Sequence, residues 1–171
     1  FGTANLALKH YKKAIKNFKE SIAVNPNRPE VFYNLGITFY SDGNLEKSIE
    51  SYKKAIQLKP NYAEAYCNLG MSFFKKGDLG EAIKNYIKVI KINPTDAGAY
   101  FNLGNSYQSK ENWSLAFDNY KKAIDIKPDY AEAYYNLGIF FSKQGKYEES
   151  ISSLRKTLKL QPFNEGALHM L

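Results

Sequence analysis

The sequence has 171 residues, of which 44% are hydrophobic and 15% aromatic, so it can build a folded core and is neither disordered nor low in complexity. Lysine and arginine total 24 against 17 aspartate and glutamate residues, and this net charge of +7 raises the question of an acidic or nucleic-acid partner. No apolar run approaches the roughly 20 residues that cross a bilayer, and one cysteine cannot form an intramolecular disulfide. We therefore expect no membrane insertion and an intracellular, cytoplasmic protein.

A period of 34 residues runs through the whole sequence. Apolar residues within each period follow helical spacing, which predicts two helices per unit. In chain order, a partial unit at 1–28 precedes complete units at 29–62, 63–96, 97–130 and 131–164, and 165–171 begins another. The periodic residues include the prolines Pro26, Pro60, Pro94, Pro128 and Pro162 and the Asn-Leu-Gly asparagines Asn34, Asn68, Asn102 and Asn136.

Each unit contains signals for the ends of its two helices. The first helix ends at a glycine such as Gly43 in Asp-Gly-Asn, because glycine adopts the left-handed conformation that terminates a helix. The second helix ends before the periodic proline, which has no N–H and disfavours helix in the residue ahead of it. In the third complete unit Glu111 replaces the glycine, so we expect that turn to use Asn112 or another conformation.

A second periodic glycine follows Asn-Leu in the middle of each first helix. Glycine costs about 1 kcal/mol there relative to alanine, which predicts a close contact with another helix. The second helix carries small residues in a matching phase, and we expect a bulky neighbour to fill the space beside each glycine. The bulky residues are Phe18, Tyr52, Tyr86, Tyr120 and Leu154.

With aromatic residues, Leu-Gly, small residues and proline at fixed offsets, the whole sequence resembles the tetratricopeptide repeat family. The resemblance implies an all-α, right-handed superhelical solenoid of helix-turn-helix repeats, with first helices lining the concave face and second helices facing outward. Its uninterrupted units and periodic asparagines also resemble the repeat domain of the O-linked N-acetylglucosamine transferases, in which an asparagine ladder holds the polypeptide.

This resemblance places a row of asparagines beside a row of aromatic residues on the concave face. An amide both donates to and accepts from a peptide backbone, and several hydrogen bonds of about 0.5–1.5 kcal/mol each supply useful affinity. The alternative is that these amides bond neighbouring helices or water. The candidate peptide-binding residues are Asn34, Asn68, Asn102, Asn136, Tyr33, Phe101, Tyr135, Tyr40, Phe74 and Asn105.

Other kinds of site have less support in the sequence. The family's clamp for acidic C-termini needs lysine and arginine where these units carry aromatic residues and asparagine. The lysines repeating on the second helices predict a solvated face, which argues against nucleic acid. Because the only histidines, His10 and His169, lie near opposite ends, we expect no catalytic site, metal site, cofactor or small-molecule substrate.

We therefore interpret the chain as a scaffold without enzymatic activity that binds an extended peptide or protein segment along its concave face. The alternative is a structural subunit of a larger assembly, formed by end-to-end stacking or by the basic convex face. Phe1 and Leu171 stand at the same repeat position, which indicates a segment of a longer chain. An uncapped final helix predicts an exposed apolar end and head-to-tail self-association.

Overall fold

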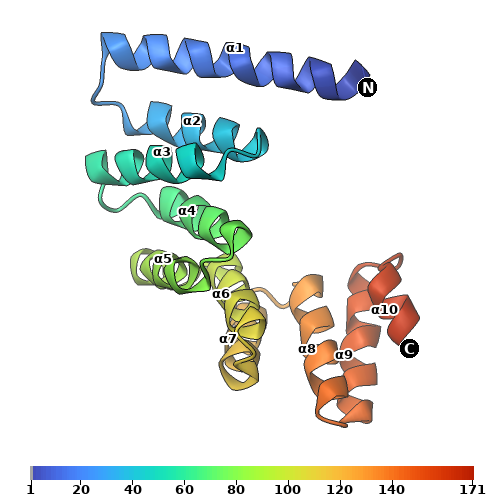
Figure 1. Cartoon of the computed structure of the whole chain (residues 1–171). Helices are drawn as coiled ribbons and strands as arrows, with labels where there is room; N and C mark the ends of the chain where they lie inside the picture. Colours follow the sequence, from blue (N-terminus) through green and yellow to red (C-terminus); the bar gives the residue numbers. More distant parts are fainter. Residues whose placement is uncertain (1) are drawn as a thin grey trace. The chain divides into compact units, whose positions relative to one another are not determined.

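The computed structural model describes residues 2–171, with side chains from His10 onward, and this part of the chain forms ten helices and no strand (Figure 1). The predicted all-α helical solenoid class is confirmed, whereas the repeat position of Phe1 lies outside the described residues. The helices are α1 (Gly2–Val24), α2 (Pro29–Ser41), α3 (Leu45–Leu58), α4 (Ala63–Lys76), α5 (Leu79–Ile92), α6 (Ala97–Ser109), α7 (Trp113–Ile126), α8 (Ala131–Lys143), α9 (Tyr147–Leu160) and α10 (Glu165–Met170).

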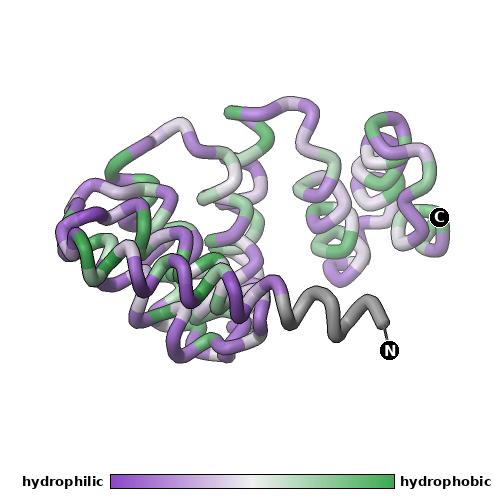
Figure 2. Tube along the Cα trace, turned by 90° about the horizontal axis from the view of Figure 1, so that it is seen from above, coloured by the Kyte–Doolittle hydropathy of each residue, from purple (hydrophilic) through white to green (hydrophobic). Residues whose placement is uncertain are grey.

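The helices belong to two compact units, of which the first ends at Ile92 and the second comprises Asn93–Leu171. In the first unit α2 packs on α3 and α4 on α5, while α3 also contacts α4 and α1 contacts α2. The second unit repeats this order with α6 on α7, α7 on α8, α8 on α9 and α9 on α10. Hydrophobic and hydrophilic positions alternate along the helices of each unit (Figure 2), as expected where one face of a helix is buried against its neighbours.

The turns between the two helices of a repeat use the predicted left-handed residue. The φ angles of Gly43, Gly77 and Gly145 are 80°, 88° and 70°. Glu111 adopts the same conformation at φ 59°, so the expectation of a different conformation at this turn is wrong. Asn112 instead caps α7, and its side chain accepts a hydrogen bond from the Leu115 N–H. The repeat geometry therefore imposes left-handed backbone even on a residue with a Cβ atom.

The ends of the second helices also follow the sequence prediction. Helices α3, α5, α7 and α9 each end two residues before a periodic proline. In the partial repeat at the start of the chain, α1 continues as one helix of 23 residues. Lys9 occupies the position of Gly43 there, and lysine favours helix where glycine ends it.

The glycine in the middle of each first helix lies against a bulky residue of the second helix. A Cβ atom on Gly36, Gly70 or Gly104 would lie 2.6, 2.7 or 2.6 Å from a ring carbon of the tyrosine 16 residues later. These three tyrosines are at most 2% exposed. In the last complete repeat Leu154 fills the same space beside Gly138. The predicted close contact is confirmed in all four complete repeats.

Candidate functional site

The predicted peptide-binding residues all lie on first helices, because the Asn-Leu-Gly motif belongs to the first helix of each repeat. Asn34 is exposed, and the other nine side chains are half-buried. By helix, they are Tyr33, Asn34 and Tyr40 on α2, Asn68 and Phe74 on α4, Phe101, Asn102 and Asn105 on α6, and Tyr135 and Asn136 on α8.

In the first unit an asparagine side chain joins two first helices. Asn68 Nδ2 donates to the Tyr33 hydroxyl at 3.1 Å, which links α4 to α2. The Tyr33 ring packs between Tyr52 and Tyr62, with ring centroids 5.9 and 5.0 Å away. Burial raises the pKa of Tyr33, so its hydroxyl stays protonated while its oxygen accepts the hydrogen bond from Asn68. This contact uses one of the two Asn68 N–H donors.

Beside this bond lies a small apolar pocket of about 150 Å³. Its wall includes Ile37 and Met71, whose side chains are 37% and 36% exposed. Tyr40 and Tyr52 complete the apolar lining, and Asn68 supplies an amide at the edge. Such a pocket accepts an aliphatic side chain while the neighbouring amide meets polar backbone.

The second unit uses a different partner for the equivalent asparagine. Asn136 Nδ2 donates to Asn105 Oδ1 at 2.9 Å, which links α8 to α6. The Tyr120 hydroxyl lies 2.8 Å from the same Oδ1 and 2.6 Å from Gln108 Oε1, and its single proton is donated to one of them at a time. Burial raises the pKa of Tyr120 well above its ordinary value, and a hydrogen bond with Asn136 offsets part of this effect.

The remaining predicted residues have individual environments. Phe101 packs between Tyr120 and Tyr130, with ring centroids 5.9 and 4.9 Å away. The Tyr135 hydroxyl lies against Gly166 of α10, where a Cβ atom would clash with it. The structure thus brings Tyr33 together with Asn68 and Asn105 together with Asn136, and packs other members of the aromatic row within the repeats.

Five contributors were not among the predicted site residues, namely Ile37, Met71, Tyr52, Gln108 and Tyr120. Tyr52 and Tyr120 were expected only as bulk beside glycine, yet Tyr52 lines the pocket and the Tyr120 hydroxyl reaches Asn105 and Gln108. The signal was present in the sequence: a buried tyrosine, unlike phenylalanine, has a hydroxyl that needs a partner. Gln108 was recognisable as a polar residue at a position where the first repeat has Tyr40.

The described side chains contain few features of other site types. No group of three histidine, cysteine or acidic residues is placed to hold a metal ion among residues 10–171. Within the described part of the chain, every helix is too short or too polar to cross a membrane. Lys54, Lys88 and Lys122 on the second helices are exposed, as predicted, whereas Lys156 of the same row is half-buried.

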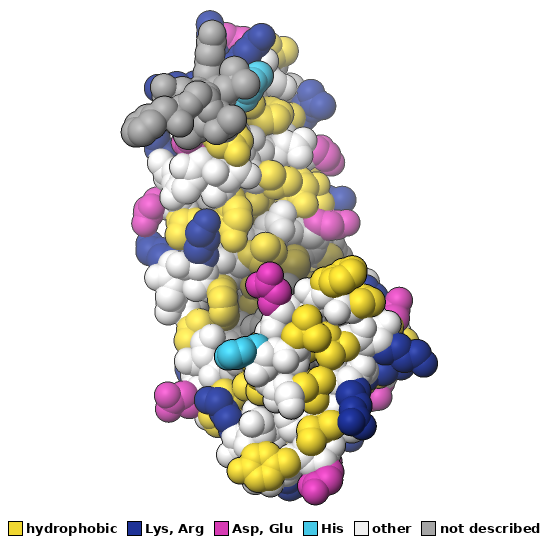
Figure 3. All heavy atoms as spheres, turned by 90° about the vertical axis from the view of Figure 1, so that its right-hand side faces the viewer, with side chains coloured by type: hydrophobic (Ala, Val, Ile, Leu, Met, Phe, Trp, Pro, Cys, Tyr) yellow, Lys and Arg dark blue, Asp and Glu magenta, His cyan; other side chains and the backbone are white. Residues whose placement is uncertain are grey.

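Exposed apolar side chains lie on α10 of the second unit and just before and after this helix. Phe163, Leu168 and Leu171 are 90%, 54% and 53% exposed. Hydrophobic side chains gather on this part of the unit, with charged side chains at its edges (Figure 3). Exposed apolar surface of this kind is typical of a contact region.

Comparison with known proteins gives consistent results for the repeats. A family model described as TPR repeat matches residues 2–43, 38–77, 71–111 and 105–145, and one described as tetratricopeptide repeat matches 131–164. No curated protein matches the chain. Two crystal structures of MamA are similar, at 32% identity and TM-score 0.83 over 89% of each chain, and at 30% identity and TM-score 0.81 over 94% of this chain and 88% of that one. The fold is shared with TTC0263, a thermophilic TPR protein in Thermus thermophilus, at 22% identity and TM-score 0.72 over 99% of this chain and 93% of that one.

Proposed function

The chain belongs to the tetratricopeptide repeat family, and from this membership we propose a protein-interaction scaffold that holds an extended peptide along its first-helix face. The first-helix face is the surface formed by α2 and α4 in the first unit and by α6 and α8 in the second. No catalytic step, cofactor or small-molecule substrate is part of this proposal. The proposal includes the resemblance to the repeat domain of the O-linked N-acetylglucosamine transferases, because the asparagine ladder was inferred from that resemblance.

The observation that carries the proposal is the pocket beside Asn68. Ile37 and Met71 expose about a third of their side chains at a place where an amide is also available. An extended peptide places side chains on alternate sides, so an aliphatic side chain enters the pocket while its backbone meets the amide.

The asparagine side chains can form hydrogen bonds both within the repeats and to a bound peptide. Asn68 and Asn136 each donate a hydrogen bond to a neighbouring first helix, and each side chain also carries an Oδ1 acceptor that suits a peptide N–H. Asn34 is exposed on α2 and adds a further amide. We propose that the intramolecular bonds orient these side chains, so that less entropy is lost when a peptide binds.

The test measures binding of a diverse library of unstructured peptides to the wild type and to Asn68→Ala/Asn102→Ala. We expect the double variant to keep its helical circular dichroism and to lose about 1–3 kcal/mol of binding free energy, or about five- to 150-fold in affinity. The matched control is Lys88→Glu/Lys122→Glu, which changes exposed second-helix residues and should leave this binding within about twofold. Equal binding by the wild type and the folded asparagine variant would assign the asparagine row a purely structural role.

A second candidate function is a structural subunit that associates with itself or with a larger assembly. Its support is the exposed apolar group that includes Phe163 and Leu168, since such surface is buried when it meets a complementary one. We expect light scattering over a concentration series to show reversible association that Leu168→Asp weakens. A strict monomer at high concentration would refute head-to-tail association without affecting the peptide proposal.

A further inference from the structure

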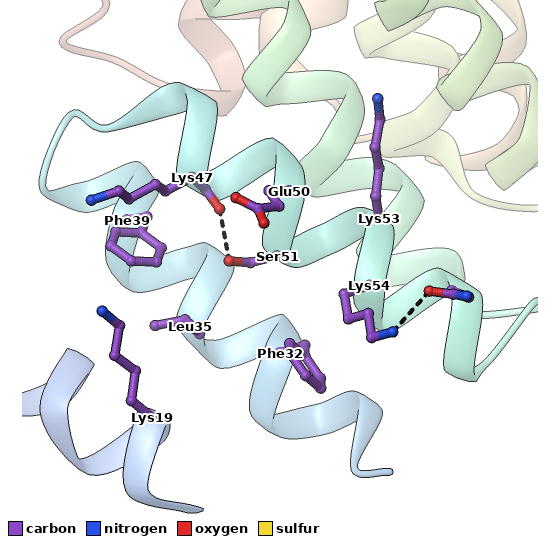
Figure 4. Close-up of a pocket in the computed structure, with 10 residues that line it drawn as sticks. Lys19, Phe32, Leu35, Phe39, Lys47, Glu50, Ser51, Lys53 and Lys54 are labelled. Atoms are coloured by element: carbon purple, nitrogen blue, oxygen red, sulfur yellow. Dashed lines mark hydrogen bonds between the residues drawn. The ribbon is translucent and has the colours of Figure 1, made fainter. Parts of the chain in front are cut away.

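A larger groove lies on the other side of the first unit, where α1 and α3 flank α2. It has a volume of about 690 Å³, which is comparable to the volume of many ligand-binding clefts. None of the predicted peptide-binding residues lines it. The lining residues are Lys19 of α1, Phe32, Leu35 and Phe39 of α2, and Lys47, Glu50, Ser51, Lys53, Lys54 and Gln57 of α3 (Figure 4).

The floor of this groove is an apolar ridge on α2. Phe32, Leu35 and Phe39 stand at positions i, i+3 and i+7, so they follow one face of the helix over about 10 Å. Phe32 is half-buried, and the other two are each 6% exposed. On the α3 wall the Ser51 hydroxyl donates to the Lys47 carbonyl at 2.7 Å, so the small polar side chain there is satisfied. Ridges with this spacing pack into the grooves of another helix.

The rim of the groove is positively charged. Lys19 and Lys54 lie around the floor with one carboxylate, Glu50, and Lys47 Nζ lies 5.6 Å from the ring of Phe39 in the floor (Figure 4). Lys53 turns away toward Phe73 of α4, 5.6 Å from its ring. Lys54 Nζ donates to Gln57 Oε1 at 3.0 Å. The ion pairs among the described side chains are Lys16–Glu20, Lys76–Glu46 and Lys84–Glu81, so none of them neutralises a rim lysine.

One lysine of the rim is particular to the first complete repeat. The position of Lys47 is occupied by Glu81, Leu115 and Glu149 in the following repeats. In the next repeat Glu81 forms an ion pair with Lys84 on the same helix, which satisfies the charge locally. Lys54 recurs as Lys88, Lys122 and Lys156, so Lys47 is the rim lysine that the repeat pattern does not supply.

We propose that this groove binds an amphipathic helix of a partner protein, with apolar residues at i, i+3 or i+4 and i+7 and with acidic residues beside them. The apolar stripe packs on Phe32, Leu35 and Phe39, and the carboxylates meet Lys19, Lys47 and Lys54. The apolar floor disfavours a phosphate backbone, which would need polar donors along its path. Charge complementarity with the lysine rim selects an acidic partner, and the helical spacing of the floor selects a helix.

The experiment selects peptides from a displayed random library on three forms of the intact chain. These are the wild type, Lys47→Glu/Lys54→Glu, and the control Lys88→Glu/Lys122→Glu, whose charge change is the same but lies outside the groove. Sequences enriched on the wild type and the control but not on the groove variant should combine acidic residues with an apolar stripe of helical spacing. One of them, synthesised with a fluorophore, should bind the groove variant at least about tenfold more weakly than the control.

Further changes locate the site and separate it from the first-helix face. Glu50→Gln removes the one carboxylate of the lining and should strengthen binding of the same peptide about two- to fivefold. Asn68→Ala/Asn102→Ala should leave that binding unchanged, so failure of the extended-peptide proposal and failure of this one are distinguishable. The proposal is overturned if no sequences depend on the groove lysines, or if those that do are basic, lack an apolar stripe or bind equally well after the stripe is scrambled. It is also overturned if duplex DNA competes as effectively as the selected peptide.

Discussion

On the first-helix faces of the two units, equivalent asparagines donate their hydrogen bonds to different side chains. In the first unit Tyr33 accepts a hydrogen bond from Asn68, and Ile37 is exposed beside the pocket. In the second unit the residue equivalent to Tyr33 is a phenylalanine, and Asn136 donates to Asn105 instead. The lost hydroxyl is thus accompanied by a new amide at the position of Ile37.

This difference shows that Asn68 and Asn136 are each held by the acceptor that the neighbouring first helix provides. It also divides the proposed binding face by chemistry. The first unit offers an apolar pocket with an amide at its edge, and the second offers a group of amides and a tyrosine hydroxyl. We expect the first unit to favour an aliphatic side chain of a bound peptide and the second unit to favour polar groups.

The largest expected difference between the units appears at alkaline pH. Burial raises the pKa of Tyr52 and Tyr86 in the first unit and of Tyr120 in the second well above the usual value. In the last complete repeat the equivalent residue is Leu154, which has no titratable group. Below about pH 10 these tyrosines are protonated in both the folded and the unfolded state, so their contribution to stability is fully present. Above about pH 10 only the unfolded state releases the tyrosine proton, and the free energy of unfolding falls by about 1.4 kcal/mol per tyrosine per pH unit. Burial also raises the pKa of Tyr33 and Tyr62 in the first unit, so this unit should lose at least about twice as much stability as the second at about pH 11.

Urea unfolding at neutral pH and at about pH 11 tests this difference. Fluorescence of Trp113, the only tryptophan of the chain, reports on the second unit, and far-UV circular dichroism reports on both. The midpoint from circular dichroism should fall further than the midpoint from fluorescence. Tyr86→Phe should reduce that extra loss, and an unchanged alkaline loss in this variant would contradict the assignment to buried tyrosines.

The next largest effect concerns the glycine contacts within the second unit. A Cβ atom in Gly104→Ala would lie 2.6 Å from Cε1 of Tyr120, a rigid ring that is 1% exposed. We expect overpacking to outweigh the helix propensity of alanine and to lower the free energy of unfolding by about 2 kcal/mol.

Gly138→Ala is the matched control, because its nearest neighbour is Leu154, whose rotamers can adjust. The loss there should be about 1 kcal/mol smaller than in Gly104→Ala in the same urea titration. Equal losses for the two variants would mean that the tyrosine ring is no more restrictive than leucine.

A smaller effect is expected from giving the second unit the hydrogen bond of the first. Asn105→Ile removes the acceptor of Asn136 Nδ2 and should cost about 1–1.5 kcal/mol, since Tyr120 retains Gln108. Adding Phe101→Tyr supplies a hydroxyl in the position that Tyr33 occupies relative to Asn68. The double variant should recover about half of the loss.

A double-mutant cycle by urea denaturation measures this recovery as a coupling free energy. Phe101→Tyr alone serves as the control and should change stability little while Asn105 still accepts from Asn136. Additive effects of the two substitutions would show that the units do not use interchangeable partners.

The sequence predicted the features that repeat and missed those that do not. The helix pairs, the helix ends and the contact between Gly104 and Tyr120 follow from spacing, because each is required once per period. The hydrogen bond between Asn136 and Asn105 could not be predicted from the periodicity, because an asparagine occurs at the position of Asn105 in one repeat only. The groove beside Lys19 was missed for a related reason, since it requires knowing how α1 and α3 flank α2.

The smallest expected effect is at the turn where the second unit departs from glycine. Glu111 holds left-handed backbone at φ 59°, which costs a residue with a Cβ atom roughly 1–2 kcal/mol. Glu111→Gly relieves that cost but increases the freedom of the unfolded chain, so the net gain should be about 0.5–1 kcal/mol. The reverse change, Gly77→Ala at φ 88°, should lose about 1 kcal/mol in the first unit. The midpoint of thermal unfolding should rise in Glu111→Gly. Trp113 fluorescence measures it, because Trp113 begins α7 directly after the turn. A lower midpoint would mean that the glutamate side chain stabilises the turn by more than its backbone conformation costs.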